Sequence, residues 1–69
     1  MNKQTQMKRV LKHIDEHGSI TQDEADQLKV KRLSARIFDI RKSGIEIITD
    51  TMYGKNEYGV FHYARYRRA

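Results

Sequence analysis

The stretch TQDEADQLKVKRLSARIFDIRKSG, residues 21–44, decides the fold of this chain. It opens with Thr21-Gln22-Asp23-Glu24, a capping box in which the threonine hydroxyl and the glutamate carboxylate each satisfy a free backbone N–H group. This signal predicts a helix from Gln22 to near Leu28. The short connection Lys29-Val30-Lys31 follows, and apolar residues then recur at helical spacing until Gly44. They predict a second helix over about residues 32–43.

The flanking segments complete a small domain around these two helices. An apolar stripe at i, i+3, i+4 and i+7 predicts an earlier helix over residues 5–16, which stops at Gly18. Ser19 and Ile20 should be extended. Beyond Gly44 the period changes to two, which predicts a strand over residues 45–52, a loop over 54–59 and a returning strand over 60–67.

The apolar residues of these elements are enough for one small core. Replacing Leu33 or Ile37 by alanine should unfold the domain. The residues expected to converge are Val10, Leu11, Ile14, Ile20, Ala25, Leu28, Val30, Leu33, Ile37, Ile40, Ile45, Ile47 and Tyr66. The expected fold class is therefore α+β, mainly α, with three helices, a C-terminal β-hairpin and a short third strand.

Length and composition narrow the possibilities further. The chain has 69 residues, of which 38% are hydrophobic and 33% charged, so we expect one domain over residues 1–69 and no room for a larger enzyme fold. It has no cysteine, which excludes disulfides and thiolate metal sites and fits a reducing compartment. The longest stretch without charge, Tyr58–Ala64, is far too short for a membrane span. We expect a cytoplasmic protein without membrane contact.

Positive charge is concentrated where the second helix of the pair is expected. The net charge is +5, which favours a polyanionic partner. Residues 29–42 hold six cationic side chains against Asp39 alone, whereas residues 13–28 hold five acidic and no basic side chains apart from histidine. The positive segments could converge on one side of the molecule, although solvated helix faces would explain the same pattern.

The arrangement of helix, turn, helix and hairpin is that of a winged helix-turn-helix. The residues themselves resemble the small winged helix-turn-helix domains of bacteriophage and prophage proteins over about residues 7–66. The resemblance is most specific in Arg32-Leu33-Ser34-Ala35-Arg36-Ile37, and it is also seen in Gly18-Ser19-Ile20-Thr21, Asp39-Ile40-Arg41, Gly44 and Tyr63-Ala64-Arg65-Tyr66. It implies that the helix over residues 32–43 enters the DNA major groove. Where that family commonly has a glycine in the turn, this chain has Lys29, which should be strained by about 1 kcal/mol if it adopts the left-handed conformation.

Helical geometry independently selects a DNA-facing surface. With Leu33, Ile37 and Ile40 turned to the core, the outward positions are Lys31, Ser34, Ala35, Phe38, Asp39 and Lys42. Small and polar residues allow close approach to base edges, and cations at the margins bind phosphates. The expected base-reading residues are Lys31, Ser34, Ala35 and Phe38. The expected phosphate-binding residues are Arg32, Arg36, Arg41, Lys42, Lys55, Asn56 and Arg67.

Three features admit a second interpretation. Phe38 could contact a thymine methyl or a protein surface. Asp39 would repel phosphate unless it orients Arg36 three residues earlier. The aromatic residues of the hairpin could stack on single-stranded bases, but cross-strand packing explains them more simply.

The motif His13-Ile14-Asp15-Glu16-His17 fits the H-x-x-E-H spacing of a family of zinc peptidases. A catalytic zinc needs a third ligand and a cleft, which so short a chain can hardly supply. We therefore expect no enzyme activity, no cofactor and no small-molecule substrate. The expected function is sequence-specific binding of double-stranded DNA by a phage-type or prophage-type transcriptional regulator or recombination accessory factor, acting as a homodimer or with a protein partner in a bacterial host cell. The alternative is a protein-binding winged helix, such as a phage factor that inhibits a host nucleic-acid enzyme.

Overall fold

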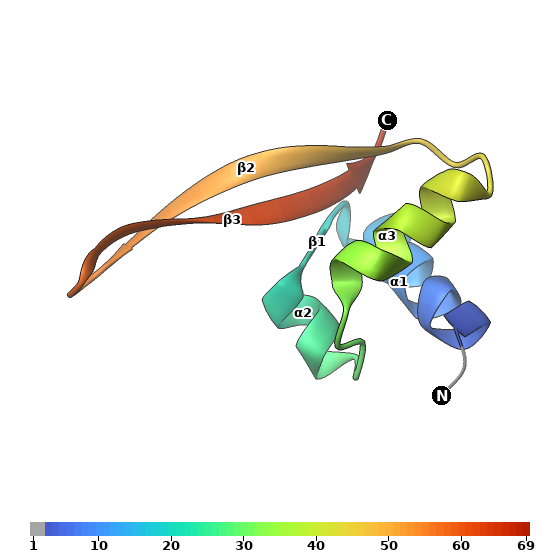
Figure 1. Cartoon of the computed structure of the whole chain (residues 1–69), viewed down its shortest axis with the longest axis horizontal. Coiled ribbons are helices and arrows are strands. Elements are labelled where there is room, and N and C mark those ends of the chain that lie inside the picture. The colour runs from blue at the N-terminus through green and yellow to red at the C-terminus, as the bar shows by residue number, and fades with distance from the viewer. Residues whose placement is uncertain (1–2) are drawn as a thin grey trace.

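The computed structural model describes residues 3–69 as three helices and a three-stranded antiparallel sheet (Figure 1). The element order is α1 (Lys3–His17), β1 (Ile20–Thr21), α2 (Gln22–Gln27), α3 (Leu33–Lys42), β2 (Ile47–Asn56) and β3 (Gly59–Arg68). This is the predicted α+β winged arrangement. None of the helices in this described part of the chain has the length and hydropathy that a bilayer crossing requires.

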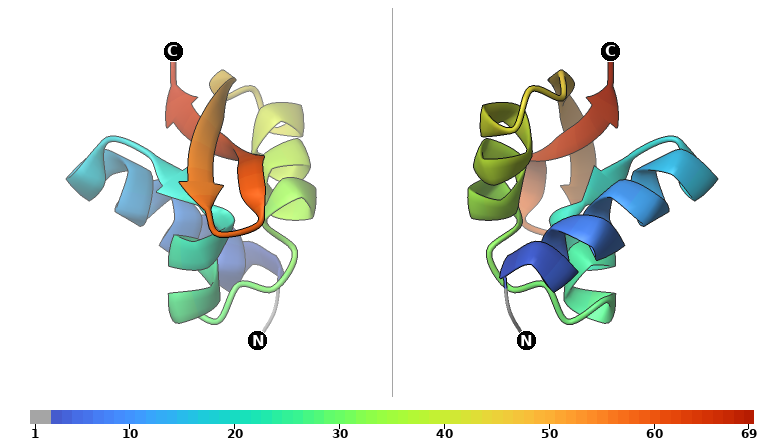
Figure 2. Two further views of the ribbon diagram at one scale, coloured as in Figure 1. Left: turned by 90° about the vertical axis from the view of Figure 1, so that its left-hand side faces the viewer. Right: turned by 90° about the vertical axis from the view of Figure 1, so that its right-hand side faces the viewer.

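The sheet has the strand order β1-β3-β2, so the last strand in the sequence is the central one. The short β1 pairs with the C-terminal half of β3, with Ile20 opposite Tyr66, and β2 pairs with β3 along its whole length. Because β1 leads directly into α2 and β3 follows the hairpin turn, this pairing joins the helical body to the hairpin. Figure 2 views the molecule along the hairpin and shows the helices packed against one another at its base.

The core lies where the three helices meet the base of the sheet. All the residues predicted for the core are found there, nine of them buried or nearly so. Leu33, Ile37 and Ile40 of α3 are at most 1% exposed, so the helical stripe read from the sequence is the buried one. The buried residues are Val10, Ile14, Ile20, Ala25, Val30, Leu33, Ile37, Ile40 and Ile47, and Met7, Leu11, Leu28, Ile45 and Tyr66 pack against them.

The turn between α2 and α3 is a Schellman motif centred on Lys29. The Lys29 N–H donates to the Asp26 carbonyl at 3.0 Å and the Val30 N–H donates to the Ala25 carbonyl at 2.8 Å, which satisfies the last carbonyls of α2. Lys29 itself has φ of 64°. This chain therefore places a lysine in the left-handed conformation, at a cost of about 1 kcal/mol relative to glycine.

The hairpin is longer and its connection tighter than the sequence predicted. Gly54, Lys55 and Asn56 belong to β2 and Gly59 to β3, so only Glu57 and Tyr58 connect the strands. The expected loop over residues 54–59 is thus wrong in extent. A strand tolerates Gly54 because the Phe61 ring lies across it: a β-carbon added there would collide with the Phe61 ring, the arrangement in which an aromatic ring covers a cross-strand glycine.

The start of β2 also differs from the prediction. The strand begins at Ile47 and not at Ile45. The reason is the exit from α3, where the Gly44 N–H donates to the Arg41 carbonyl at 3.0 Å and the Ile45 N–H donates to the Ile40 carbonyl at 3.4 Å. Ile45 is therefore still part of the helix cap, with its side chain against the core.

Candidate nucleic-acid interface

The outward face of α3 is open to solvent over the length of the helix. Ser34, Phe38 and Lys42 follow one another at i, i+4 and i+8 and are all exposed, and the side of α3 opposite to them is the buried core stripe. Phe38 is 64% exposed, so most of its ring is open to solvent. The face thus combines a hydroxyl, an aromatic ring and a cation, and Ala35 at its margin is half-buried.

Asp39, the only acidic residue of α3, does not belong to this face. The helical projection placed it outward, but its carboxylate lies 3.3 Å from Arg36 Nε, and the two side chains are only 14% and 17% exposed. The interpretation that Asp39 orients Arg36 is confirmed by this contact. Because Arg36 neutralises the Asp39 carboxylate, the exposed face of α3 carries no competing negative charge.

A cationic hollow lies beside the beginning of α3. It has a volume of about 400 Å³ and is lined by Gln6, Lys29, Lys31, Arg32 and Arg36. Of these, Lys31, Arg32 and Arg36 were predicted to contact DNA, and the structure brings them together. Gln6 and Lys29 were missed: Gln6 comes from α1 and accepts a hydrogen bond of 3.5 Å from Arg36 Nη1, which no sequence pattern indicates.

Backbone geometry adds to the positive character of this hollow. Arg32 is the N-cap of α3 and makes no side-chain capping hydrogen bond, and the first turn of α3 contains no acidic residue. The free N–H groups at the start of a helix carry a partial positive charge. Together with the surrounding lysine and arginine side chains they favour a phosphate group.

The other predicted phosphate-binding residues lie apart from the hollow. Lys42 is exposed at the C-terminal end of α3. Lys55 and Asn56 lie near the tip of the hairpin, at the far end of the molecule from α3 (Figure 1). The Asn56 side chain accepts a hydrogen bond from the Tyr58 N–H at 2.8 Å and so closes the turn.

Arg41 and Arg67 are engaged within the protein. Arg41 Nε and Nη2 donate to the Ile47 carbonyl at 3.1 and 2.8 Å, and Nη2 also donates to Thr49 Oγ1. Arg67 Nε donates to Asp50 Oδ2 at 2.7 Å, and Arg65 lies 3.6 Å from the same oxygen. The hydrogen bond from Arg67 is the main reason that the pKa of Asp50 lies below its ordinary value. Phosphate binding by Arg41 and Arg67 stays a prediction.

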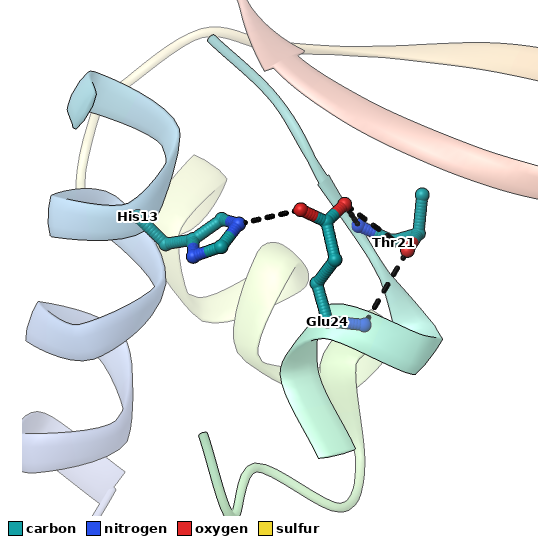
Figure 3. Close-up of polar contacts among 3 residues, drawn as sticks. All are labelled: His13, Thr21 and Glu24. Carbon is teal, nitrogen blue, oxygen red and sulfur yellow. Dashed lines mark hydrogen bonds and ion pairs between the residues drawn. The ribbon is translucent and has the colours of Figure 1, made fainter. Parts of the chain in front are cut away.

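The capping box of α2 also holds the helix pair against α1 (Figure 3). The Glu24 carboxylate accepts from the Thr21 N–H at 3.1 Å, and its other oxygen lies 2.7 Å from His13 Nε2 of α1. Burial raises the pKa of Glu24, but the hydrogen bonds from His13 and Thr21 outweigh it, so this pKa lies below its ordinary value. A carboxylate can only accept hydrogen bonds, so the ring nitrogen is the donor.

The histidines are not arranged as a metal site. The rings of His13 and His17 lie 4.4 Å apart between centroids, but His13 is directed to Glu24. Within residues 3–69 there is no group of three or more histidine, aspartate or glutamate side chains that could hold a metal ion.

Comparison with known proteins agrees with this architecture. Residues 5–67 match the model of a family described as a winged helix-turn-helix domain. No curated protein and no solved structure matches the chain. Since the match extends over nearly the whole chain, including most of α1, all of α2 and α3 and the greater part of the hairpin, the chain belongs to the winged helix-turn-helix domain family.

Proposed function

We propose that this protein binds double-stranded DNA by placing the exposed face of α3 in the major groove. The observation that carries the proposal is the composition of that face: Ser34, Phe38 and Lys42 are open to solvent, while the only carboxylate of the helix is held by Arg36. A helix with small, apolar and cationic groups on one exposed face can approach base edges without repelling the phosphates on either side.

The cationic hollow is the second region of the protein that would contact DNA. Lys29, Lys31 and Arg32 lie beside the start of α3, and Lys42 lies at its end. Cations at both ends of a helix can hold the two phosphate backbones that border the groove, while Lys31, Ser34, Ala35 and Phe38 face the bases. The proposal does not include Lys55 and Asn56, whose DNA contact no observation supports.

The finer role follows from the resemblance of the Arg32–Ile37 run. It supports a bacterial cytoplasmic regulator of the phage or prophage type, in transcription or as a recombination accessory factor. No residue constellation in the described part of the chain supports catalysis, so we propose a binding module. A selection of bound genomic fragments would identify the target, and the positions of the bound sites relative to promoters or recombination sites would separate the two roles.

The decisive experiment is a titration with duplex DNA at two salt concentrations. Three phosphate contacts, from Lys29, Arg32 and Lys42, should weaken binding by about 40-fold between about 50 and 200 mM salt. Absence of binding at both concentrations would contradict the proposal. It would favour the alternative of a protein-binding winged helix, for which the exposed Phe38 ring would be the anchor.

A further inference from the structure

The distal half of the hairpin, residues 53–62, forms an arm that extends beyond the helices (Figure 1). Five of the six large apolar side chains that are exposed in the described residues belong to the hairpin. Tyr53 and Val60 are each 72% exposed, Tyr58 at the tip is 90% exposed, and Phe61 is 44% exposed. Such a concentration of exposed apolar surface marks an interaction site.

The two faces of the arm differ in how they are covered. Strand alternation and the register place Tyr53, Lys55, Val60 and His62 on one face. Phe61 and Tyr63 lie on the other, where Phe61 covers Gly54 and both line a hollow against the start of α2. The Tyr53 and Val60 face is therefore the more open one.

The arm is not built to contact phosphates. Residues 53–62 contain one lysine, Lys55, one glutamate, Glu57, and no arginine or aspartate, so the formal charges of the arm cancel in a chain of net charge +5. Elements that enter the DNA minor groove use arginine, lysine, asparagine and glutamine, and of these the arm has only Lys55 and Asn56, whose side chain accepts a hydrogen bond from the Tyr58 N–H. Apolar, charge-poor surface is the composition of the central part of a protein interface.

The strand edges of the arm are also open. β2 is an edge strand of the sheet, and β1 covers β3 only at Arg65 and Tyr66. Proteins usually protect such edges with proline, bulges or several lysines. The chain has no proline, and the arm has one lysine, so both edges can accept another strand. An isolated two-stranded ribbon is marginally stable in water. A partner would supply the packing that the helices do not provide to the arm.

We infer that the arm binds the arm of a second copy of this chain, with the Tyr53 and Val60 faces at the centre of the interface. A two-fold contact must be self-complementary. The arm carries one charge of each sign two residues apart, so that Lys55 of one copy can meet Glu57 of the other. Tyr53 on this face and Tyr58 at the tip contribute roughly 300 Å², against about 800 Å² per partner in a stable interface, and the open edges and Val60 supply the remainder.

This inference rests on the proposed function in one respect. A single module of this size reads one half-site, and specificity normally comes from two modules on a two-fold site. An interface on the arm leaves α3 of both copies open, because the arm tip lies at the opposite end of the molecule from α3 (Figure 1).

Sedimentation equilibrium of the full chain without DNA tests the interface. The wild type should dimerise, and the double variant Tyr53→Thr, Val60→Thr should raise the dimer dissociation constant at least about 30-fold. Threonine keeps the preference for a strand, so far-UV circular dichroism should be unchanged. Phe38→Ala is the matched control: it removes a ring of similar exposure from α3 and should leave the dimer intact.

Three results would overturn the inference. The first is a wild type that stays monomeric up to about 1 mM, where even a weak dimer would be populated. The second is a dimer that survives the double variant. The third is a double variant that binds a short duplex of about one helical turn less tightly than a monomeric wild type does. That result would show that the arm contacts DNA. A dimer that is lost in the double variant, in a protein that binds no DNA, would support the interface and reject the proposed function.

Discussion

His13 Nε2 of α1 lies 2.7 Å from Glu24 Oε2 of α2, so the carboxylate that completes the capping box also joins the two helices. One side chain thereby fixes both the start of α2 and its position against α1. Because α2 and the turn that follows it carry α3, this contact sets the orientation of the proposed DNA-binding helix.

This contact predicts a dependence of stability on pH. The pKa of Glu24 is lower in the folded protein than its ordinary value of 4.5. The ionised carboxylate therefore contributes fully to the free energy of unfolding above about pH 4.5, and this contribution is lost as the pH falls through the folded pKa. Glu24→Gln should flatten this part of the acid unfolding curve, measured as the free energy of unfolding in urea from about pH 7 to pH 3.

Thr21→Ala is the control for the Glu24 variant. It removes the hydroxyl that caps α2 and should cost about 1 kcal/mol at neutral pH, while retaining the carboxylate beside His13. An acid slope that stays the same in Glu24→Gln as in the wild type would show that the hydrogen bonds to this carboxylate contribute nothing to the pH dependence.

Lys29→Gly should separate stability from binding. Glycine adopts the positive φ of this position without strain, so the variant should be more stable by about 0.5 to 1 kcal/mol, equivalent to a rise in Tm of about 4 °C. The same change removes a cation from the hollow at the start of α3, so the slope of log affinity against log salt should fall by about 0.9.

Two further substitutions control for this result. Lys29→Asn tolerates the left-handed conformation and removes the charge, so its DNA affinity should fall as in Lys29→Gly. Lys29→Arg keeps the charge and should keep the affinity. Equal affinities in all four proteins would exclude Lys29 from the interface.

Ser34, Phe38 and Lys42 should differ in what they control. Phe38→Ala or Ser34→Ala should reduce the free-energy difference between the preferred base and the other bases by about 1 to 3 kcal/mol at the position that the side chain contacts. The salt dependence of binding should not change. Lys42→Ala should weaken binding to all sequences alike and lower the salt slope by about 0.9. Competition binding to a randomised duplex library measures both effects, and variants that leave them unchanged would contradict the assignment of α3.

Leu33→Ala tests the scaffold under that face. Leu33 is 1% exposed, and its truncation should cost about 2 to 5 kcal/mol, a large part of the stability of a domain of this size. Thermal unfolding followed by circular dichroism should show the loss. Ser34→Ala, one residue away but exposed, should stay within about 0.5 kcal/mol of the wild type.

Arg41 is predicted by its surroundings to be a structural anchor. Its guanidinium joins the end of α3 to the Ile47 carbonyl and Thr49 of β2, a forked contact that lysine cannot reproduce. Arg41→Lys should therefore lower the free energy of unfolding by about 1 kcal/mol and leave the salt dependence of DNA binding unchanged. A stable Arg41→Lys variant that binds DNA less tightly would restore its predicted role in phosphate binding.

Local signals in the sequence were sufficient for most of the fold. The capping box at Thr21, the apolar stripe of α3 and the glycine after it each depend on residues within one or two turns, and each is found as predicted. The extent of the hairpin was not predictable in this way, because Gly54 belongs to β2 only when Phe61 of the opposite strand covers it.

In the candidate site, too, local sequence patterns predict some features, whereas others depend on contacts between distant residues. The outward residues of α3 follow from helical periodicity, but the partners of Asp39 and Arg41 depend on where their side chains point. Gln6 reaches the cationic hollow because α1 crosses beside α3, a relationship between residues thirty positions apart that no local pattern contains.

The central position of β3 has a consequence for synthesis of the protein on the ribosome. Ile20 of β1 pairs with Tyr66, which is synthesised 46 residues later. At ordinary translation rates the synthesis of these residues takes about 2 to 9 s. During that interval the residues of all three helices are synthesised, but the strand that joins them to the hairpin is not complete. The sheet can therefore form only after nearly all of β3 has been made, and any earlier association of the helices leaves Ile20 without its partner strand.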